Sequence, residues 1–166
     1  MKKIFFCFLV LLAFQSKAQE TNILQLKDVD EKKIFHDAPF TGKAYTYSGD
    51  GSKTSESNFV NGKLSGIQTS WYKNGKIYNT AEFKDGKFNG MMTYYYENGQ
   101  IKSQEIYVND FRNGLAVYFY ENGQKESEGH YIDCFNDGLW TYWDKEGKKI
   151  MERNYDKGKL LKEEKF

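Results

Sequence analysis

Cysteine, histidine and proline are scarce in this chain, which has two, two and one of them among 166 residues. His36 and His130 lie far apart, without Cys, Asp or Glu at ligand spacing, so neither a zinc site nor a nucleophile–histidine pair is indicated. A formal net charge of +1 gives no electrostatic footprint for nucleic acid or for an anionic membrane. We therefore expect no enzyme: no catalytic residues, no cofactor-binding residues, no metal ligands and no nucleic-acid partner.

Long apolar runs are also missing, except at the N-terminus. Lys2 and Lys3 precede an apolar stretch at residues 4–14, and small residues follow at Ser16 and Ala18. This pattern is typical of a secretory signal peptide cleaved after Ala18, because a membrane-spanning helix needs about twenty apolar residues. We expect an exported protein, periplasmic or secreted, with no transmembrane segment after cleavage. Cys134 is then the only cysteine, available at most for a bond between two chains.

Glycine, in contrast, is present in a strict order. Thirteen of the fifteen glycines fall into three columns spaced 24 residues apart, which indicates a tandem repeat. The first column comprises Gly42, Gly66, Gly90, Gly114 and Gly138; the second comprises Gly51, Gly75, Gly99, Gly123 and Gly147; the third reads Gly62, Gly86, Asp110, Cys134 and Gly158.

One unit reads as strand, turn, strand, turn. Asn74-Gly75 and Asp85-Gly86 separate segments rich in aromatic and β-branched residues, which is the strongest short-range signal for β-hairpins. The predicted fold is all-β: an elongated, twisted, single-layer antiparallel sheet of tandem hairpins, with a helix in the signal peptide. The predicted divisions are a signal peptide at 1–18, an N-terminal cap or partial repeat at 19–37, five repeats at 38–158 and a charged C-terminal edge at 159–166.

Strand alternation then assigns residues to two faces. A bulged three-residue loop at Lys73-Asn74-Gly75 would place Phe83 on the face of Trp71, and this register gathers the apolar positions on one side. That predicted packed face holds Ile67, Met91, Leu115 and Leu139 together with the column Phe59, Phe83, Tyr107, Tyr131 and Tyr155. The opposite face, with His130, is predicted to be the interaction surface through Tyr72, Tyr94, Tyr96, Tyr118, Tyr120 and Tyr142.

The repeat resembles the bacterial variant of the MORN repeat. The best copies are residues 90–99 and 114–123, which read Gly-x-x-x-Tyr-x-Tyr-x-Asn-Gly, and the resemblance extends over residues 38–160. Ser48-Gly49 in the first copy and Asp144 in the last depart from the pattern. Many such proteins are grouped with the YwqK family, regarded as antitoxin components, so the resemblance implies a cognate toxin as partner. MORN arrays also imply roles in protein assembly and membrane-lipid contact.

Two functions follow as expectations. The first is a non-enzymatic, exported protein-interaction module, antitoxin-like or immunity-like, that binds a protein through its tyrosine face. The alternative is an envelope- or carbohydrate-binding protein whose tyrosines stack on sugar rings. Cross-strand tyrosines also stabilise an open sheet, so a purely structural role for these residues stays open.

Overall fold

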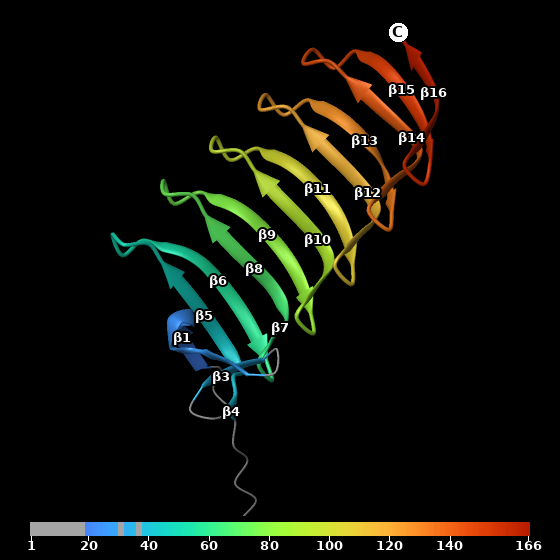
Figure 1. The fold of residues 1–166 in the computed structure, drawn as a ribbon. Coiled ribbons are helices and arrows are strands. Elements are labelled where there is room, and N and C mark those ends of the chain that lie inside the picture. The colour runs from blue at the N-terminus through green and yellow to red at the C-terminus, as the bar shows by residue number, and fades with distance from the viewer. Residues whose placement is uncertain (1–18, 30–31, 36–37) are drawn as a thin grey trace, which may run out of the picture.

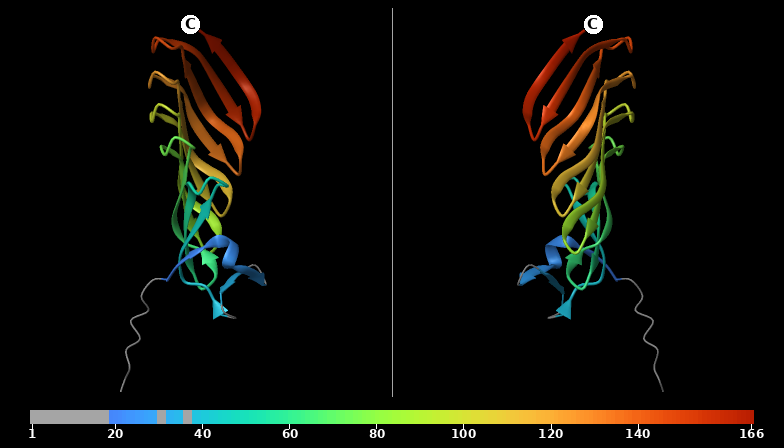
Figure 2. Two further views of the ribbon diagram at one scale, coloured as in Figure 1. Left: turned by 90° about the vertical axis from the view of Figure 1, so that its left-hand side faces the viewer. Right: turned by 90° about the vertical axis from the view of Figure 1, so that its right-hand side faces the viewer.

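The computed structural model describes residues 19–29, 32–35 and 38–166. The predicted signal peptide and its helix lie outside these residues, as does His36. The hairpins stand side by side along a gently curved array that twists along its length (Figure 1). Seen edge-on, the array is one layer thick, with the N-terminal segment lying against one side (Figure 2). The predicted elongated, single-layer, all-β fold is confirmed.

The main sheet has thirteen strands. Its order is β1-β5-β6-β8-β9-β10-β11-β12-β13-β14-β15-β16, and β7 pairs with β6. All pairs in this sheet are antiparallel except β1 with β5. The strands are β1 (Gln19–Asn22), β5 (Gly42–Tyr47), β6 (Lys53–Val60), β7 (Lys63–Leu64), β8 (Gly66–Trp71), β9 (Ile77–Lys84), β10 (Lys87–Tyr95), β11 (Ile101–Val108), β12 (Phe111–Phe119), β13 (Lys125–Ile132), β14 (Phe135–Trp143), β15 (Lys149–Asp156) and β16 (Lys159–Lys165).

The N-terminal segment covers the first hairpin. After β1 come a 3-10 turn, η1 (Ile23–Gln25), and a separate small sheet of β2 (Lys27–Val29), β3 (Lys32–Phe35) and β4 (Ala38–Pro39). Leu26 packs with Phe40, Ala44 and Phe59 in a buried cluster. This cluster gives the first repeat the apolar partner that later repeats obtain from their predecessors.

A turn at one end of each hairpin makes a three-residue loop. The amide of Gly75 donates to the Tyr72 carbonyl at 3.0 Å, and the amide of Tyr72 donates to the Lys76 carbonyl at 2.8 Å. Gly75 has a φ of 80°. This is the three-residue loop that the sequence predicts, since a positive φ closes it without steric strain. The amide of the third-column residue at the other end reaches back to the preceding hairpin, as in Gly86 to the Leu64 carbonyl at 2.8 Å.

Asp110 and Cys134 occupy the third glycine column with left-handed backbones, at φ 74° and 70°. Each offsets the steric cost with a side-chain hydrogen bond: Asp110 Oδ1 accepts from the Phe88 amide at 2.7 Å, and Cys134 Sγ accepts from the Arg112 amide at 3.2 Å. Both also donate their own amides to these residues, which ties each turn to the hairpin before it. The free thiol of Cys134 is exposed.

The two faces of the sheet

The predicted separation of Ile67, Met91, Leu115 and Leu139 from Tyr94, Tyr118 and Tyr142 is correct, but the predicted face of the second strand in each hairpin is wrong. Ser70 pairs with Asn79, but Trp71 pairs with Ile77, so Tyr78 is an extra residue in β9. Because side chains alternate, one extra residue moves the rest of the strand to the other face. Phe83 therefore shares a face with Gly66, Gln68 and Ser70, not with Trp71. The equivalent extra residues in the other hairpins are Thr54, Lys102, Glu126 and Ile150.

We call the face that carries Ala81, Phe83, Met92 and Tyr107 the inner face, since these residues form or flank the second buried cluster. The opposite face, which carries Ile67, Met91, Leu115 and Leu139, is the outer face. These four residues, predicted to be packed, are exposed, at 55%, 42%, 38% and 55%. His130, predicted to lie on the tyrosine face, pairs with Leu115 and Asp137 and lies on the outer face.

Candidate functional site

The three tyrosines at the centre of the predicted interaction surface belong to the packed inner face. Tyr94 flanks the cluster of Ala81, Phe83 and Met92. Tyr118 stacks on Trp140 with ring centroids 6.3 Å apart, and Tyr142 lies 6.5 Å from the same indole. Trp140 itself is 3% exposed. Replacing Tyr94, Tyr118 and Tyr142 together would therefore remove packing as well as any contact surface.

Polar groups between these rings are paired within the sheet. The Arg112 guanidinium lies over the Tyr131 ring at 4.3 Å and 3.8 Å from the carboxylate of buried Glu105. Burial, and next the charge of Glu105, raise the pKa of Tyr107 to about 12. Burial, and next the hydrogen bond with Tyr131, raise the pKa of Tyr118. The phenols of Tyr107 and Tyr118 therefore stay neutral at physiological pH, and the charged groups among these rings, Arg112 and Glu105, are paired with each other.

The other three predicted tyrosines join neighbouring repeats. Tyr72 donates its hydroxyl to the Tyr95 carbonyl at 2.7 Å, Tyr96 donates to Phe119 at 2.7 Å, and Tyr120 donates to Trp143 at 2.9 Å. Each bond connects one loop to the strand of the next hairpin, so we call these three residues the tyrosine staples. Their hydroxyls are already used, and the motif alone gave no sign of the acceptor.

Removing one staple hydroxyl tests this role. Tyr96→Phe is expected to lower the free energy of unfolding by about 1 kcal/mol, since it deletes one hydrogen bond and leaves the Phe119 carbonyl without that donor. Urea denaturation followed by circular dichroism measures the change. Tyr47→Phe, which alters a ring that is 49% exposed, is the matched control and should leave stability within about 0.5 kcal/mol. Equal effects of the two substitutions would contradict the staple assignment.

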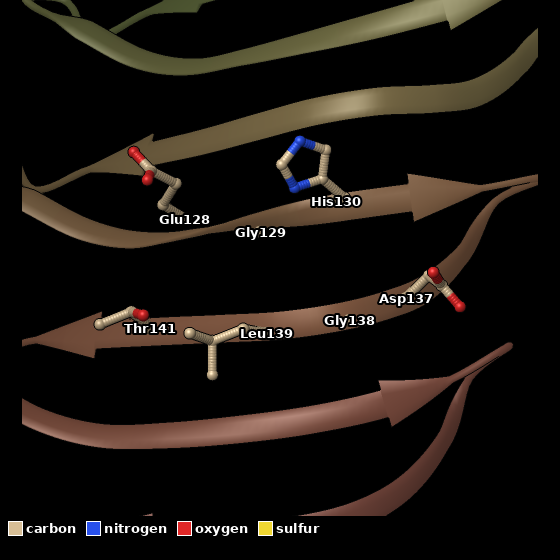
Figure 3. A pocket seen from close by; sticks show the side chains of 7 residues that line it. All are labelled: Glu128, Gly129, His130, Asp137, Gly138, Leu139 and Thr141. Atoms are coloured by element: carbon tan, nitrogen blue, oxygen red, sulfur yellow. The ribbon is translucent and has the colours of Figure 1, made fainter.

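Polar side chains on the outer face gather around a shallow pocket of about 450 Å³ on β13 and β14, lined by Glu128, Gly129, His130, Asp137, Gly138, Leu139 and Thr141. They do not converge on one point, since Asp137 points away from the imidazole of His130 (Figure 3). Glu128 is paired with Lys125 at 2.6 Å. Within residues 19–29, 32–35 and 38–166 there is no cluster of three His, Cys, Asp or Glu residues able to hold a metal ion.

A second feature of the outer face is apolar. The outer-face row of Ile67, Met91, Leu115 and Leu139 repeats once per hairpin from β8 to β14. It continues toward the two-residue turns, where Val108 pairs with Phe111 and Ile132 pairs with Phe135. By strand alternation these pairs also lie on the outer face, and all four side chains are 43–57% exposed. Together the eight residues form what we call the outer apolar patch.

Such an array of hairpins, in which each repeat contacts only its neighbours, defines a quasi-one-dimensional repeat protein. A family model described as the MORN repeat variant matches residues 64–85, 88–109, 112–133 and 136–157. These matches span more than half of the sequence, and the chain belongs to the MORN repeat variant family. Hairpin β5–β6 lies outside the matched ranges, although it continues the same sheet. The comparison with curated proteins gives no match.

The matches coincide with structural units. The matched ranges 88–109, 112–133 and 136–157 each begin shortly after one two-residue turn and end at the following two-residue turn. Each range therefore corresponds to one hairpin, such as β10–β11. The described residues contain no helix long and apolar enough to cross a membrane. The matched ranges also include the outer-face row of Ile67, Met91, Leu115 and Leu139, one residue in each match.

Proposed function

We propose that this chain is a non-enzymatic protein-interaction module that binds a partner protein through the outer apolar patch. The observation that carries the proposal is the regular row of exposed aliphatic side chains on β8, β10, β12 and β14. Exposed apolar side chains in a regular row, with the polar residues Glu82 and His130 on the strands between them, are typical of binding sites. In the part of the chain that the structure describes, no second layer covers this face of β8–β14 (Figure 2).

The chemistry of the patch favours a protein partner over a glycan. Sugar rings stack on open aromatic faces, whereas the outer-face indoles already have lysines above them: Lys53 Nζ lies 4.4 Å from the Trp71 ring centroid, and Lys125 Nζ lies 5.1 Å from that of Trp143. The exposed row itself is aliphatic or thioether, which suits apolar side chains of a protein. Carbohydrate binding is the weaker proposal, since it would rest on only two exposed rings of the patch, Phe111 and Phe135, beside the two-residue turns.

The finer identity of the partner follows from the family resemblance. A YwqK-like relationship makes a cognate toxin the proposed partner. Export, proposed from the N-terminal sequence, would place neutralisation outside the inner membrane, as an immunity protein acts. The outer apolar patch would then cover part of the toxin surface. Hydrophobic centres with polar rims are common in such protein–protein contacts.

The proposal is tested by placing charge in the patch. Leu115→Lys combined with Leu139→Lys is expected to reduce capture of the bound protein from an envelope fraction at least tenfold, because an ammonium would be buried against an apolar partner. Quantitative mass spectrometry of the protein retained by wild type and variant gives the ratio.

The matched control is Val60→Lys combined with Leu161→Lys, which adds the same charges at exposed apolar positions outside the row. This control should retain capture, and circular dichroism should show both variants folded. Undiminished capture by the Leu115 and Leu139 variant would refute the patch as the binding surface. Equal loss by the control would show that added charge acts nonspecifically.

A further inference from the structure

The first repeat lacks the tyrosine that joins later repeats. In the column 48, 72, 96, 120, the first position is Ser48. The backbone there has the same turn as in the later repeats. The amide of Ser48 donates to the Ser52 carbonyl at 2.9 Å, as the amide of Tyr72 donates to the Lys76 carbonyl at 2.8 Å. The difference is therefore confined to the side chain, and the serine hydroxyl is turned into its own loop, where it donates to Asp50 and to the Ser52 carbonyl.

The acceptor that a tyrosine at position 48 would use is still present. The staples end on the carbonyls of Tyr95, Phe119 and Trp143, and the equivalent residue one repeat earlier is Trp71. Its staple position, 48, holds a serine whose hydroxyl bonds within its own loop, so no staple reaches the Trp71 carbonyl. The strand pairing of β8 with β6 reaches only as far as Ser70, as the pairing of β10 with β9 reaches Tyr94. Trp71 therefore lies one residue beyond the β6–β8 pairing, as Tyr95 lies one residue beyond the β9–β10 pairing, while both stay paired with the strand that follows.

A pocket of about 410 Å³ lies between the first two loops, beside Ser48 and Tyr72, the residue that follows Trp71. Its lining includes Ser48, Thr54, Tyr72 and Lys73, together with Gly49, Asp50, Ser52 and Lys53. This volume is within the range of pockets that hold small ligands. The pocket lies at the loop end of the sheet, away from the outer apolar patch.

The surroundings of the existing staples show what such a pocket accepts. Lys145 Nζ lies 6.0 Å from the Tyr120 ring centroid, and its counterpart beside Ser48 is Lys73. Lys102 Nζ lies 5.7 Å from the Tyr96 ring centroid, and its counterpart is Thr54. Lys73 and Thr54 both line the pocket. The same two positions that flank a phenol ring in later repeats thus flank the pocket in the first.

We propose that this pocket binds the phenol side chain of a tyrosine, supplied by a partner protein and donating its hydroxyl to the Trp71 carbonyl. The partner rests on the proposed function, whereas the phenol specificity rests on the pocket alone. The chain itself displays the ligand three times, in the staples. A phenylalanine would fill the ring space but leave the carbonyl unpaired, which costs affinity once water is displaced.

The test is a titration of the isotopically labelled protein with N-acetyltyrosinamide, monitored by two-dimensional NMR. Saturable shifts are expected at the amides of residues 48–54 and 71–73, with N-acetylphenylalaninamide at least fivefold weaker. Ser48→Ala should bind normally, because it leaves the pocket open. Ser48→Tyr should lose the response and raise the melting temperature, because its own ring forms a fourth staple.

A second variant provides a gain of binding. Tyr96→Ser should open an equivalent pocket two repeats later, so that N-acetyltyrosinamide also shifts amides near residues 96–100 and 119–121. The proposal is overturned if the tyrosine analogue gives no saturable response, if the phenylalanine analogue binds equally, or if the response persists in a folded Ser48→Tyr. Binding of p-cresol without N-acetyltyrosinamide would overturn the assignment to a tyrosine side chain.

The two proposals fail separately. If the outer apolar patch is not the binding surface, the Leu115 and Leu139 variant keeps its partner while the phenol titration is unaffected. If the pocket does not bind phenols, the titration fails while the patch variant still loses its partner. Partner capture by Ser48→Tyr then measures whether the pocket contributes to the same interface, with an expected loss of at least tenfold.

Discussion

Trp140→Ala is expected to lower the free energy of unfolding by about 3–5 kcal/mol, since it removes a large aromatic side chain that is almost fully buried. The indole is 3% exposed and lies against Tyr118, Tyr131 and Tyr142, with centroid distances of 6.3, 5.1 and 6.5 Å. Its Nε1 also donates to the His130 carbonyl at 3.2 Å. Urea denaturation followed by circular dichroism measures the loss.

The adjacent residue provides the control. Leu139 precedes Trp140 on β14 but points to the outer face and is 55% exposed. Leu139→Ala should change stability by no more than about 0.5 kcal/mol, because it removes little buried surface. A comparable loss from both substitutions would mean that the inner and outer faces are assigned incorrectly.

Gly129 explains how such a large ring fits on an open sheet. A Cβ atom at this position would lie 2.2 Å from the Trp140 ring, so the indole covers bare backbone. Gly129 is one of the two glycines outside the columns, and its pairing with Trp140 is specific to this repeat. We expect Gly129→Ala to be destabilising in the wild type and nearly neutral beside Trp140→Ala. A double-mutant cycle would show this coupling, whereas additive effects would contradict the contact.

The repeat architecture could be predicted because it depends on local signals. Asn-Gly and Asp-Gly turns recur every 24 residues, and the segments between them have the length and composition of paired strands. Each hairpin is closed by residues that are neighbours in the sequence. The same holds for the three-residue loop at Gly75, where one glycine in a left-handed conformation sets the turn.

The faces could not be predicted, because they depend on a single extra residue per hairpin. Positions 54, 78, 102, 126 and 150 hold Thr, Tyr, Lys, Glu and Ile, so no residue type marks the bulge. Strand alternation has a period of two, and one uncounted residue exchanges the whole inner and outer sets. Choosing the strand register that collects the most apolar residues on one face gives the wrong register here, because both faces of a single-layer sheet contact water.

The functional residues were missed for a related reason. The tyrosine columns are conspicuous in the sequence, but their partners lie in the next repeat and include backbone carbonyls, which carry no sequence signal. The outer row could have been recognised from its period alone, since Ile67, Met91, Leu115 and Leu139 follow the first glycine column directly. Ser48 was recognised as a departure from the motif, but the pocket beside it required the three-dimensional arrangement.

The contacts that stabilise this array are distributed along one dimension. Contacts run from each hairpin to its neighbours, and the buried clusters follow one another: Leu64 packs against both the cluster of Phe40 and Phe59 and the cluster of Phe83 and Met92. In such arrays stability is close to a sum of unit and interface contributions. Damage at one end should therefore stay near that end, while damage in a middle repeat affects neighbours on both sides.

Phe40→Ala makes that difference measurable. Phe40 is 2% exposed and lies 5.8 Å from the Phe59 ring centroid, beneath Leu26 of the N-terminal segment. The substitution should weaken this cluster by about 3 kcal/mol, so amides of β5 and β6 should exchange with solvent roughly 100-fold faster. Amides of β12–β15 should keep their protection in hydrogen–deuterium exchange, because none of these strands contacts the cluster.

Val60→Ala, next to Phe59 but 50% exposed, is the control and should alter neither region. Uniform loss of protection in Phe40→Ala would instead show that the array unfolds as a single cooperative unit, in which case the N-terminal segment stabilises every repeat and not only the first.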